Sequence, residues 1–279
     1  MLVTGAGRGI GRASALAFRD AGWRVVAGVR DVAAAEEAYA GTGVHVERLD
    51  VTDASSVEEG VEAAERHAGG ALACLVSNAG YAVLGAVEDA DLDEVRTMFD
   101  TNFFGAAAVV QRAVPAMREA GGGAVVFVSS IGARISNPLL GMYHASKYAL
   151  SAMAEALAVE GRPFGIRVAT VEPGMVETDF PRATRPTGAA PRGDGPYAPL
   201  LADLRVGFAA WRRDYPTGPD AVADAVVLAA LDPSSPFRVP VGDDARMLGR
   251  MRETTPDDRA FHDGLVEFLR LDWPRRPGG

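Results

Sequence analysis

The chain has very little of the residue types that disulfide frameworks and metal centres require. It contains one cysteine, Cys74, and four histidines among 279 residues. A single cysteine excludes an internal disulfide and a multi-cysteine metal site, and the histidines do not have the spacing of metal ligands. We therefore expect a cytoplasmic protein without a bound metal.

Positive charge and long apolar runs are also scarce. The chain has 28 Lys and Arg against 37 Asp and Glu, which gives a formal net charge of −9. Nucleic acids and anionic membranes attract clustered positive charge, so neither is expected as a partner. No run reaches the ~18 apolar residues of a membrane-spanning helix. Glycines and Arg8 interrupt the first ten residues, where a secretion signal would have its apolar core.

What the sequence does contain is an alternation of apolar runs with stretches of helical periodicity. The expected strands are residues 1–3, 23–28, 44–49, 72–77, 124–128, 166–171 and 237–241. The expected helices are residues 10–21, 31–40, 53–67, 92–117, 143–160 and 220–231. This pattern predicts a doubly wound, Rossmann-like α/β domain of about seven parallel strands with helices on both faces. The first strand is shorter than the usual length of about five residues, so either the strand is short or the chain starts further upstream.

The alternation breaks in a segment rich in proline and glycine, residues 174–219. Loops longer than about 15 residues in a compact domain are typically functional lids or disordered segments. The apolar residues of this segment include Phe180, Tyr197, Leu200, Phe208 and Trp211. We therefore predict a substrate lid with a short helix near residues 200–211, and a surface insertion is the alternative. Residues 243–279 predict a helical tail that packs on the lid or on a second subunit of this single-domain chain.

A glycine-rich turn, Thr4-Gly5-Ala6-Gly7-Arg8-Gly9-Ile10-Gly11, opens the first predicted helix. Glycines here permit positive φ angles, and the backbone N–H groups at a helix N-terminus bind anions such as a pyrophosphate. The spacing differs from the GxGxxG fingerprint of common dinucleotide-binding turns. The turn alone is therefore weak evidence for a nucleotide.

Three residues further along the chain indicate carbonyl chemistry. Tyr143 follows Ser130 by 13 residues, and Lys147 follows Tyr143 by four. A hydroxyl, a phenol and an ammonium can polarise a carbonyl and give it a proton. Residues four apart share one face of a helix, so Lys147 is expected beside Tyr143, where its charge would lower the pKa of the phenol. Together with the glycine turn, these residues predict a nicotinamide-dependent oxidoreductase.

The TGxxxGIG turn and the YxxxK element in this order resemble the short-chain dehydrogenase/reductase family, over about residues 2–242. The stretch VVAGVRD, residues 25–31, loosely resembles the branch with hydroxysteroid and retinol dehydrogenases and bacterial ketoreductases. The resemblance implies that Ser130, Tyr143 and Lys147 are catalytic and that Asn102 sustains a water-linked proton relay to the lysine. It also implies a homodimer or homotetramer, assembled through the helices after the fourth and fifth strands.

The resemblance further implies contacts to the cofactor. The expected residues are Gly5, Arg8, Gly9, Ile10 and Gly11 in the turn, Asp50 and Val51 beside the adenine, Asn78, Ala79 and Gly80 after the fourth strand, Tyr143 and Lys147 at the ribose, and Pro173, Gly174, Val176 and Thr178 at the nicotinamide.

The end of the second strand bears on the choice of cofactor. An acidic residue there would bond the ribose 2′-hydroxyl of NAD, whereas arginine would accommodate the 2′-phosphate of NADP. Val29 takes that position, Arg30 follows it, and Arg8 adds a second guanidinium. These residues favour NADP(H), although Asp31 would favour NAD if the register shifted by one residue.

The expected reaction is reduction of a medium or large apolar ketone, since the lid is apolar and cells usually hold NADPH reduced. Two alternatives remain open. One is an NAD-dependent alcohol dehydrogenase that works in the oxidative direction. The other is a non-catalytic nucleotide-binding regulator on the same fold.

Overall fold

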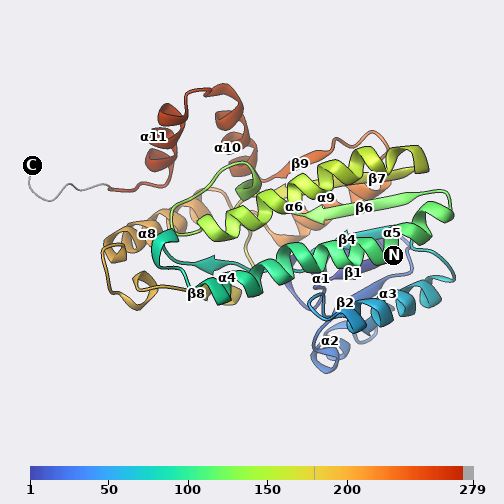
Figure 1. The fold of residues 1–279 in the computed structure, drawn as a ribbon. Coiled ribbons are helices and arrows are strands. Elements are labelled where there is room, and N and C mark those ends of the chain that lie inside the picture. Colours follow the sequence, from blue (N-terminus) through green and yellow to red (C-terminus); the bar gives the residue numbers. More distant parts are fainter. Residues whose placement is uncertain (179, 273–279) are drawn as a thin grey trace, which may run out of the picture.

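The computed structural model describes residues 1–178 and 180–272, and a parallel seven-stranded sheet forms its centre (Figure 1). The strands are β1 (Leu2–Thr4), β2 (Val26–Val29), β3 (His45–Arg48), β4 (Cys74–Ser77), β6 (Gly123–Val128), β7 (Ile166–Pro173) and β9 (Arg238–Val241). Their order is β3-β2-β1-β4-β6-β7-β9, so the direction of winding reverses between β1 and β4. This sheet confirms the predicted doubly wound fold.

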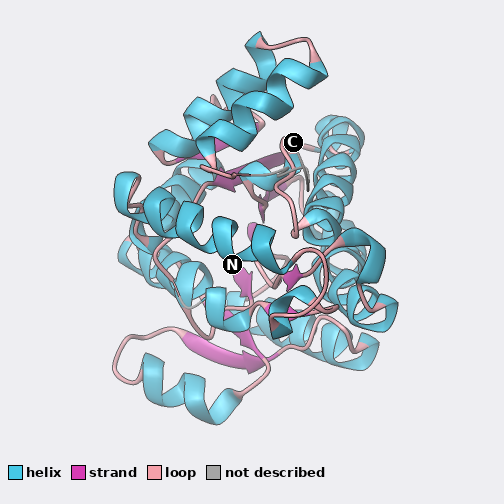
Figure 2. Cartoon of the chain, turned by 90° about the vertical axis from the view of Figure 1, so that its left-hand side faces the viewer, coloured by secondary structure: helices cyan, strands magenta, loops and turns pink. Residues whose placement is uncertain are grey.

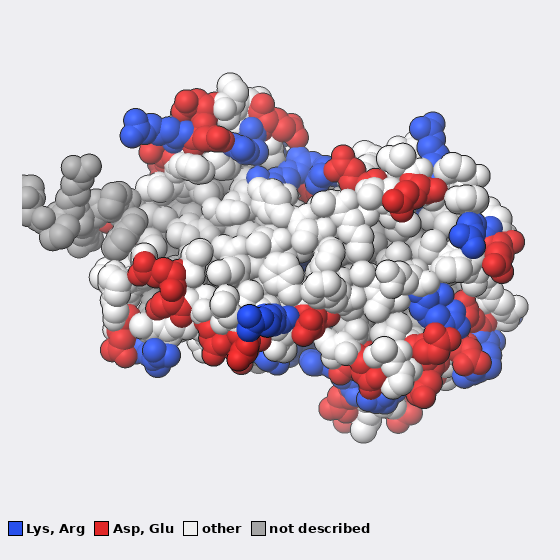
Figure 3. Space-filling model, in the orientation of Figure 1, with Lys and Arg blue, Asp and Glu red and all other residues white. Residues whose placement is uncertain are grey.

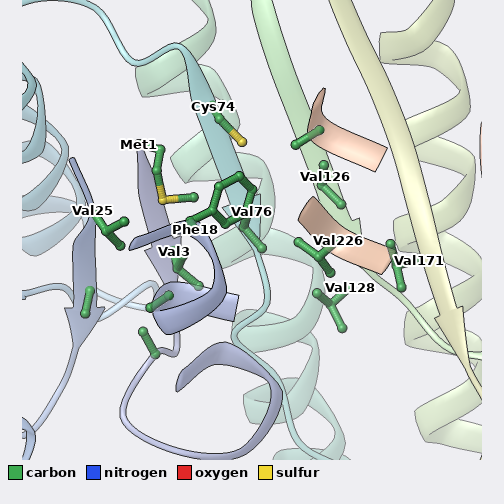
Figure 4. Packing of buried hydrophobic residues seen from close by; sticks show 14 of the residues in the cluster. Met1, Val3, Phe18, Val25, Cys74, Val76, Val126, Val128, Val171 and Val226 are labelled. Atoms are coloured by element: carbon green, nitrogen blue, oxygen red, sulfur yellow. The ribbon is translucent and has the colours of Figure 1, made fainter. Parts of the chain in front are cut away.

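Helices cover both faces of the sheet, as the view along its edge shows (Figure 2). One face carries α1 (Gly9–Asp20), α2 (Val32–Tyr39) and α9 (Pro219–Leu231), and the other carries α3 (Ala54–Ala68), α5 (Ala106–Glu119) and α6 (Gly141–Glu160). Alternate strand residues enter opposite cores because side chains along a strand point to alternate faces. Val3, Val76 and Val126 pack beneath α1 and α9 (Figure 4), whereas Leu2 and Leu75 pack beneath α3 and α5.

A third apolar cluster lies beyond the sheet, where the segment after β7 meets the end of the chain. Its helices are α8 (Ala198–Asp214), α10 (Asp243–Thr254) and α11 (Asp258–Phe268). Leu204 and Trp211 of α8 pack there with Leu248 of α10 and Leu265 of α11. Residue 179, within the predicted lid, and residues 273–279, within the predicted tail, lie outside the described residues.

Two local features differ from the predicted elements. The helix predicted over residues 92–117 consists of α4 (Leu92–Phe99), a π-helical turn η2 (Asp100–Gly105) and α5. A short parallel pair, β5 (Val83–Leu84) with β8 (Arg185–Pro186), joins the predicted lid to the segment after β4. Two-residue strands carry no periodicity that a sequence pattern could reveal.

The remaining elements are single turns: η1 (Val87–Asp89), η3 (Ile131–Ala133), η4 (Arg162–Phe164), α7 (Phe180–Ala183) and η5 (Ala190–Arg192). Among the described helices, none is both long enough and apolar enough to cross a membrane.

Candidate active site

The residues predicted from the sequence converge on one edge of the sheet. The glycine turn follows β1, Asn78 follows β4, Ser130 follows β6, and Gly174 follows β7. The carboxyl ends of parallel strands share an edge, and the winding reverses there between β1 and β4, which is where ligands bind in doubly wound sheets. The fold therefore gathers segments that are far apart in the sequence.

The glycine turn and the segment after β4 hold each other in place. The side-chain amide of Asn78 donates hydrogen bonds to the carbonyls of Thr4 (3.0 Å) and Gly5 (3.1 Å). The Thr4 hydroxyl accepts in return from the backbone N–H groups of Asn78 and Ala79. Gly5 has a φ of +64°, and a Cβ there would lie 2.8 Å from the Cα of Ala79. Glycine is thus required for both its conformation and its close approach.

The start of α1 has the character of an anion site. Arg8 occupies the N-cap position, and its side chain makes no capping hydrogen bond. Gly5, Gly7 and Arg8 are exposed, so the turn is open to a ligand. The first N–H groups of a helix have no partner within the helix and bind phosphate readily. This arrangement fits the pyrophosphate of a dinucleotide.

The segment after β7 faces the turn across the same edge. A Cβ on Gly9, which has a φ of +55°, would lie 3.6 Å from the Thr178 side chain. Thr178 accepts a hydrogen bond from the backbone N–H of Phe180 at 3.2 Å, and its own N–H donates to the Val176 carbonyl at 2.9 Å. The predicted phosphate and nicotinamide segments are therefore adjacent.

The residues at the end of β2 bear on the choice of cofactor. Val29 is buried at the strand end, and Arg30 is exposed beside it. The Asp31 carboxylate caps α2 by accepting a hydrogen bond from the backbone N–H of Ala34 at 3.2 Å. Asp31, the residue that would favour NAD over NADP, thus also has a structural role as a helix cap.

Sequence reasoning missed a contact that fixes the turn from the side of α2. The Tyr39 hydroxyl donates a hydrogen bond to the Ala6 carbonyl at 2.7 Å, and burial raises the pKa of Tyr39 to about 12. The guanidinium of Arg12 lies over the Tyr39 ring and donates to the Ala38 carbonyl. No local pattern reveals this contact because the partners, Ala6 and Tyr39, are 33 residues apart in the sequence.

The predicted adenine pair lies after β3. One oxygen of the Asp50 carboxylate accepts from both the backbone N–H and the hydroxyl of Thr52. Val51 is buried against Gly105 of η2, where a Cβ would lie 2.7 Å from the valine side chain. The roles of Asp50 and Val51 toward a base remain predictions.

Ser130, Tyr143 and Lys147 lie together behind this edge. Ser130 hydrogen-bonds the Tyr143 phenol, and its hydroxyl oxygen accepts from the Gly132 N–H at 3.0 Å. Lys147 is buried, and its ammonium donates to the Val128 carbonyl at 3.1 Å. The serine and the tyrosine are thus connected directly, and the lysine is anchored at the end of β6.

The structure does not show the predicted lowering of the Tyr143 pKa by Lys147. Burial raises the pKa of Tyr143 to about 12, and only the hydrogen bond from Ser130 opposes it. Burial also lowers the pKa of Lys147 to about 8. The expected lowering of the tyrosine pKa by the lysine is therefore wrong for this structure, because loss of water dominates and Lys147 is not among the causes of the shift.

Asn102 lies in the π-helical turn η2 and links three segments. Its side-chain N–H groups donate to the Tyr81 carbonyl and to the Ser146 hydroxyl, both at 2.9 Å, and its oxygen accepts from the Tyr81 N–H at 3.0 Å. A Cβ on Gly80 would lie 3.0 Å from the Asn102 oxygen and 3.6 Å from the Lys147 nitrogen. Asn102 and Lys147 therefore both border Gly80, as a relay between them would require.

His144 is a further residue of the site that the sequence did not single out. It is buried beside Tyr143, and its Nδ1 accepts from the Asn137 N–H at 3.0 Å. Burial lowers the pKa of His144 to about 4, so the imidazole is neutral at physiological pH. It supports the loop that follows Ser130.

The buried ammonium of Lys147 should make the protein less stable than a variant without it. At pH 7 the shift from 10.5 to about 8 corresponds to roughly 3 kcal/mol, so Lys147→Met should raise the free energy of unfolding by up to that amount while abolishing turnover. Between pH 8 and 10.5 the unfolded wild type binds more protons than the native state, so its stability should rise with pH and the difference should shrink.

Urea unfolding of both proteins across this pH range measures the effect. Lys147 is the only lysine in the chain, so labelling with an amine-reactive reagent and mass spectrometry can also follow its titration directly. A Lys147→Met variant that is less stable than the wild type at pH 7 would contradict the expectation.

The fold and the site together define an oxidoreductase with an NAD(P)-binding Rossmann fold. A family model described as short chain dehydrogenase matches residues 1–188. An uncharacterized oxidoreductase, YbbO, of Escherichia coli is 33% identical over 243 residues, which are 86% of this chain and 84% of that protein. The chain belongs to the short-chain dehydrogenase/reductase family.

Solved structures agree with this assignment. A short-chain dehydrogenase from Streptomyces avermitilis is 32% identical, with a TM-score of 0.79 over 96% of this chain and 95% of that one. One from Burkholderia cenocepacia, in complex with NADP, is 25% identical with a TM-score of 0.73 over 95% and 96%. A 3-ketoacyl-(acyl-carrier-protein) reductase from Brucella melitensis, complexed with NADH, is 25% identical with a TM-score of 0.71 over 86% and 94%.

Proposed function

We propose that this protein is an NADP(H)-dependent reductase of medium or large apolar ketones. The observation that carries the proposal is the Ser130–Tyr143 hydrogen bond at the sheet edge, with Lys147 behind it and the open turn of α1 nearby. A phenol held by a hydroxyl beside an anion site is suited to protonate a carbonyl oxygen. When bound, the nicotinamide would supply the hydride.

Each residue has a distinct task in this proposal. Ser130 holds the carbonyl oxygen and Tyr143 gives it a proton. With its pKa raised to about 12 by burial, the phenol is protonated at physiological pH. The Lys147 ammonium returns a proton to the tyrosine, and Asn102, which borders Gly80 beside it, sustains the water-linked relay that resupplies the lysine. Lys147 would also bond the ribose hydroxyls.

The proposed preference for NADP(H) rests on charge at the end of β2. Arg30 is exposed there, Val29 offers no acceptor for a ribose hydroxyl, and Asp31 is engaged as the cap of α2. Arg8 is exposed at the N-terminus of α1 and adds a second guanidinium. Guanidinium groups form charge-assisted hydrogen bonds with phosphate oxygens. Of the solved structures that resemble this chain, the one from Burkholderia cenocepacia is in complex with NADP and the one from Brucella melitensis with NADH.

Replacing Arg30 by alanine should weaken NADPH binding and leave NADH binding nearly unchanged. A hydrogen bond to a charged group contributes about 1.5–3 kcal/mol, so the Kd for NADPH should rise about 10- to 100-fold. Fluorescence titration of both cofactors measures this. Arg24→Ala is the matched control, because Arg24 is an exposed arginine that precedes the start of β2, at the opposite end from Arg30.

The titration also separates the alternatives. A preference for NADH that Arg30→Ala does not change would overturn the NADP(H) proposal and favour an NAD-dependent alcohol dehydrogenase. Binding of a nucleotide without turnover of any ketone or alcohol would favour a non-catalytic regulator.

The proposed substrate class rests on the surroundings of Tyr143. The Phe180 ring lies 5.8 Å from the Tyr143 ring, and Leu140 and Met142 pack in the same cluster as the tyrosine. Such an apolar border favours an apolar substrate. The Brucella relative is named as a ketoacyl reductase, which agrees with a ketone as the reacting group. Turnover of ketones of increasing chain length tests the class.

We also propose a cytoplasmic homo-oligomer. The lone Cys74 is buried and reduced, which is compatible with a reducing compartment. Phe104, Tyr148 and Val159 are apolar side chains that are 43–73% exposed on η2 and α6. Figure 3 shows a largely uncharged band across the face where Figure 1 places α4, α5 and α6. Sedimentation velocity would distinguish a monomer from a dimer or tetramer.

A further inference from the structure

Asp244 lies near the start of α10 and is fully buried. Its carboxylate accepts three hydrogen bonds, two from backbone N–H groups and one from a side chain. Its Oδ2 accepts hydrogen bonds from the backbone N–H of Met175 at 2.7 Å and from the indole N–H of Trp211 at 2.6 Å. Its Oδ1 accepts from the Ala245 N–H at 2.8 Å. One side chain thus joins the segment after β7, the end of α8 and the tail helix α10.

The chain keeps the space around this carboxylate clear with two glycines. A Cβ on Gly174 would overlap the Asp244 carboxylate, and so would a Cβ on Gly242. Gly242 also has a φ of +98°, which other residues rarely adopt. The carboxylate therefore occupies a position that the backbone on both sides is shaped to admit.

Trp211 connects the same point to the third apolar cluster. It is buried, and its ring meets the Phe268 ring of α11 edge-on at 5.0 Å. Leu204 of α8 packs in this cluster with Leu248 of α10 and Leu265 of α11. The helix α8 is thus clamped between the tail and the segment after β7.

We propose that Asp244 is a positioning residue that holds α8 closed against residues 173–178 and so makes the tail helices part of the substrate site. Met175, whose N–H it binds, directly precedes Val176, and the importance of that neighbour rests on the proposed function, in which Val176 and Thr178 meet the nicotinamide. The tail lies beyond residues 1–188, which the family model matches. Asp244 would therefore link a cofactor segment shared with the family to α8 and the tail helices, which lie outside that match.

The energetic reason is the desolvation of the three donors. A buried donor that loses its acceptor pays the full cost of its desolvation, because folding has already removed the water that would bond it. Removing the carboxylate would leave the Met175 and Trp211 N–H groups without their acceptor. Opening α8 toward water would then become easier, because water could bond these groups.

Limited trypsin digestion without cofactor tests the clamp. Arg205 and Arg212 are exposed side chains within α8, and trypsin can cut beside them only where the helix has opened, so cleavage there reports opening of α8. Asp244→Ala should raise the cleavage rate about tenfold, which is the effect of roughly 1.4 kcal/mol. Asp243→Ala is the control, since Asp243 is the preceding residue and its side chain is 89% exposed in a pair with Arg246. Equal rates in the two variants would overturn the proposal.

A second, milder variant keeps the test decisive if Asp244→Ala does not fold. Trp211→Phe retains an aromatic ring in the apolar cluster but removes the indole N–H together with the smaller ring of the indole, a loss of ring volume that the control variant below shares. It should raise KM for a bulky ketone about fivefold while kcat for a small ketone stays within about twofold, because only a substrate that reaches α8 senses its position. Trp23→Phe, on the far side of the sheet beside Phe18, is the control. No difference between these two variants in either KM or cleavage rate would contradict the proposal.

Failure of the proposed function is distinguishable from failure of this inference. A wild type that binds neither NADPH nor NADH would overturn the former, while the digestion rates in the absence of cofactor would still decide the role of Asp244.

Discussion

Replacing Tyr143 by phenylalanine should lower kcat/KM for ketone reduction by about a thousandfold, within the 10²–10⁴ range of a lost general acid. The substitution removes one oxygen and keeps the ring, which packs between Phe180 and His144. Ser130 would lose its hydrogen-bond partner but would retain the Gly132 N–H. The loss should therefore fall on the chemical step.

Cofactor affinity separates a catalytic loss from a structural one. The Kd for NADPH should stay within about threefold, because the phenol would contribute at most one of the many bonds to the cofactor. Tyr148→Phe is the matched control: Tyr148 lies on the same helix, is 43% exposed and should tolerate the change. A Tyr143→Phe enzyme with more than a tenth of wild-type kcat/KM would refute the proposed role of the phenol.

Replacing Glu172 by leucine should lower the free energy of unfolding by about 3 kcal/mol, toward the lower end of values for a broken buried ion pair. Glu172 is fully buried at the end of β7, and its oxygens contact Arg134 at 2.7 Å and Arg238 at 2.9 Å. Leucine would fill the space and leave both guanidinium groups without their central partner. Partial exposure of the two arginines should limit the loss, since water can solvate them.

Substitutions of other residues in the ion-pair network of Glu172 serve as controls. Glu155 pairs with Arg238 at the exposed end and should contribute less than about 1 kcal/mol, so Glu155→Gln should be nearly neutral. Combining Glu172→Leu with Arg134→Met should recover part of the lost stability, because it removes the partly buried Arg134 guanidinium, which would keep only its pair with the exposed Glu253. Urea unfolding measures all three variants. A Glu172→Leu protein within 1 kcal/mol of the wild type would contradict this account.

Activity should change with stability in the Glu172 variant. Arg134 lies in the loop four residues after Ser130, and Glu172 directly precedes Pro173 and Gly174. The ion pair therefore ties the serine loop to the segment expected at the nicotinamide. A fall in kcat/KM at temperatures where the variant is fully folded would show that the pair positions the site as well as stabilising the fold.

The sheet was predictable because buried parallel strands leave a local signature. Apolar runs such as residues 124–128 have few alternatives to a strand buried on both faces, and the glycine turn and the YxxxK element can be read without knowing any distant contact. The cap of α3 is equally local, since the Asp53 carboxylate accepts from the N–H groups of Ser55 and Ser56.

The structure decided what depends on partners far apart in the chain. Burial sets the pKa of Tyr143 near 12, although the neighbouring lysine favoured the opposite expectation. The Asp31 carboxylate could serve either a ribose or a helix, and the backbone at the start of α2 gives one of its oxygens a helix-capping role. Each outcome depends on solvent exclusion or backbone geometry, which no short pattern contains.

The sequence by itself determined the alternation of strands and helices, the glycine turn and the chemical identity of the serine, tyrosine and lysine, because these are properties of residues close together in the chain. Only the tertiary structure decided that Asp244 joins Met175 to Trp211, 69 and 33 residues away from it, and that Glu172 holds two arginines. Buried charges find their partners through the packing of whole elements, and that packing is fixed when the chain folds.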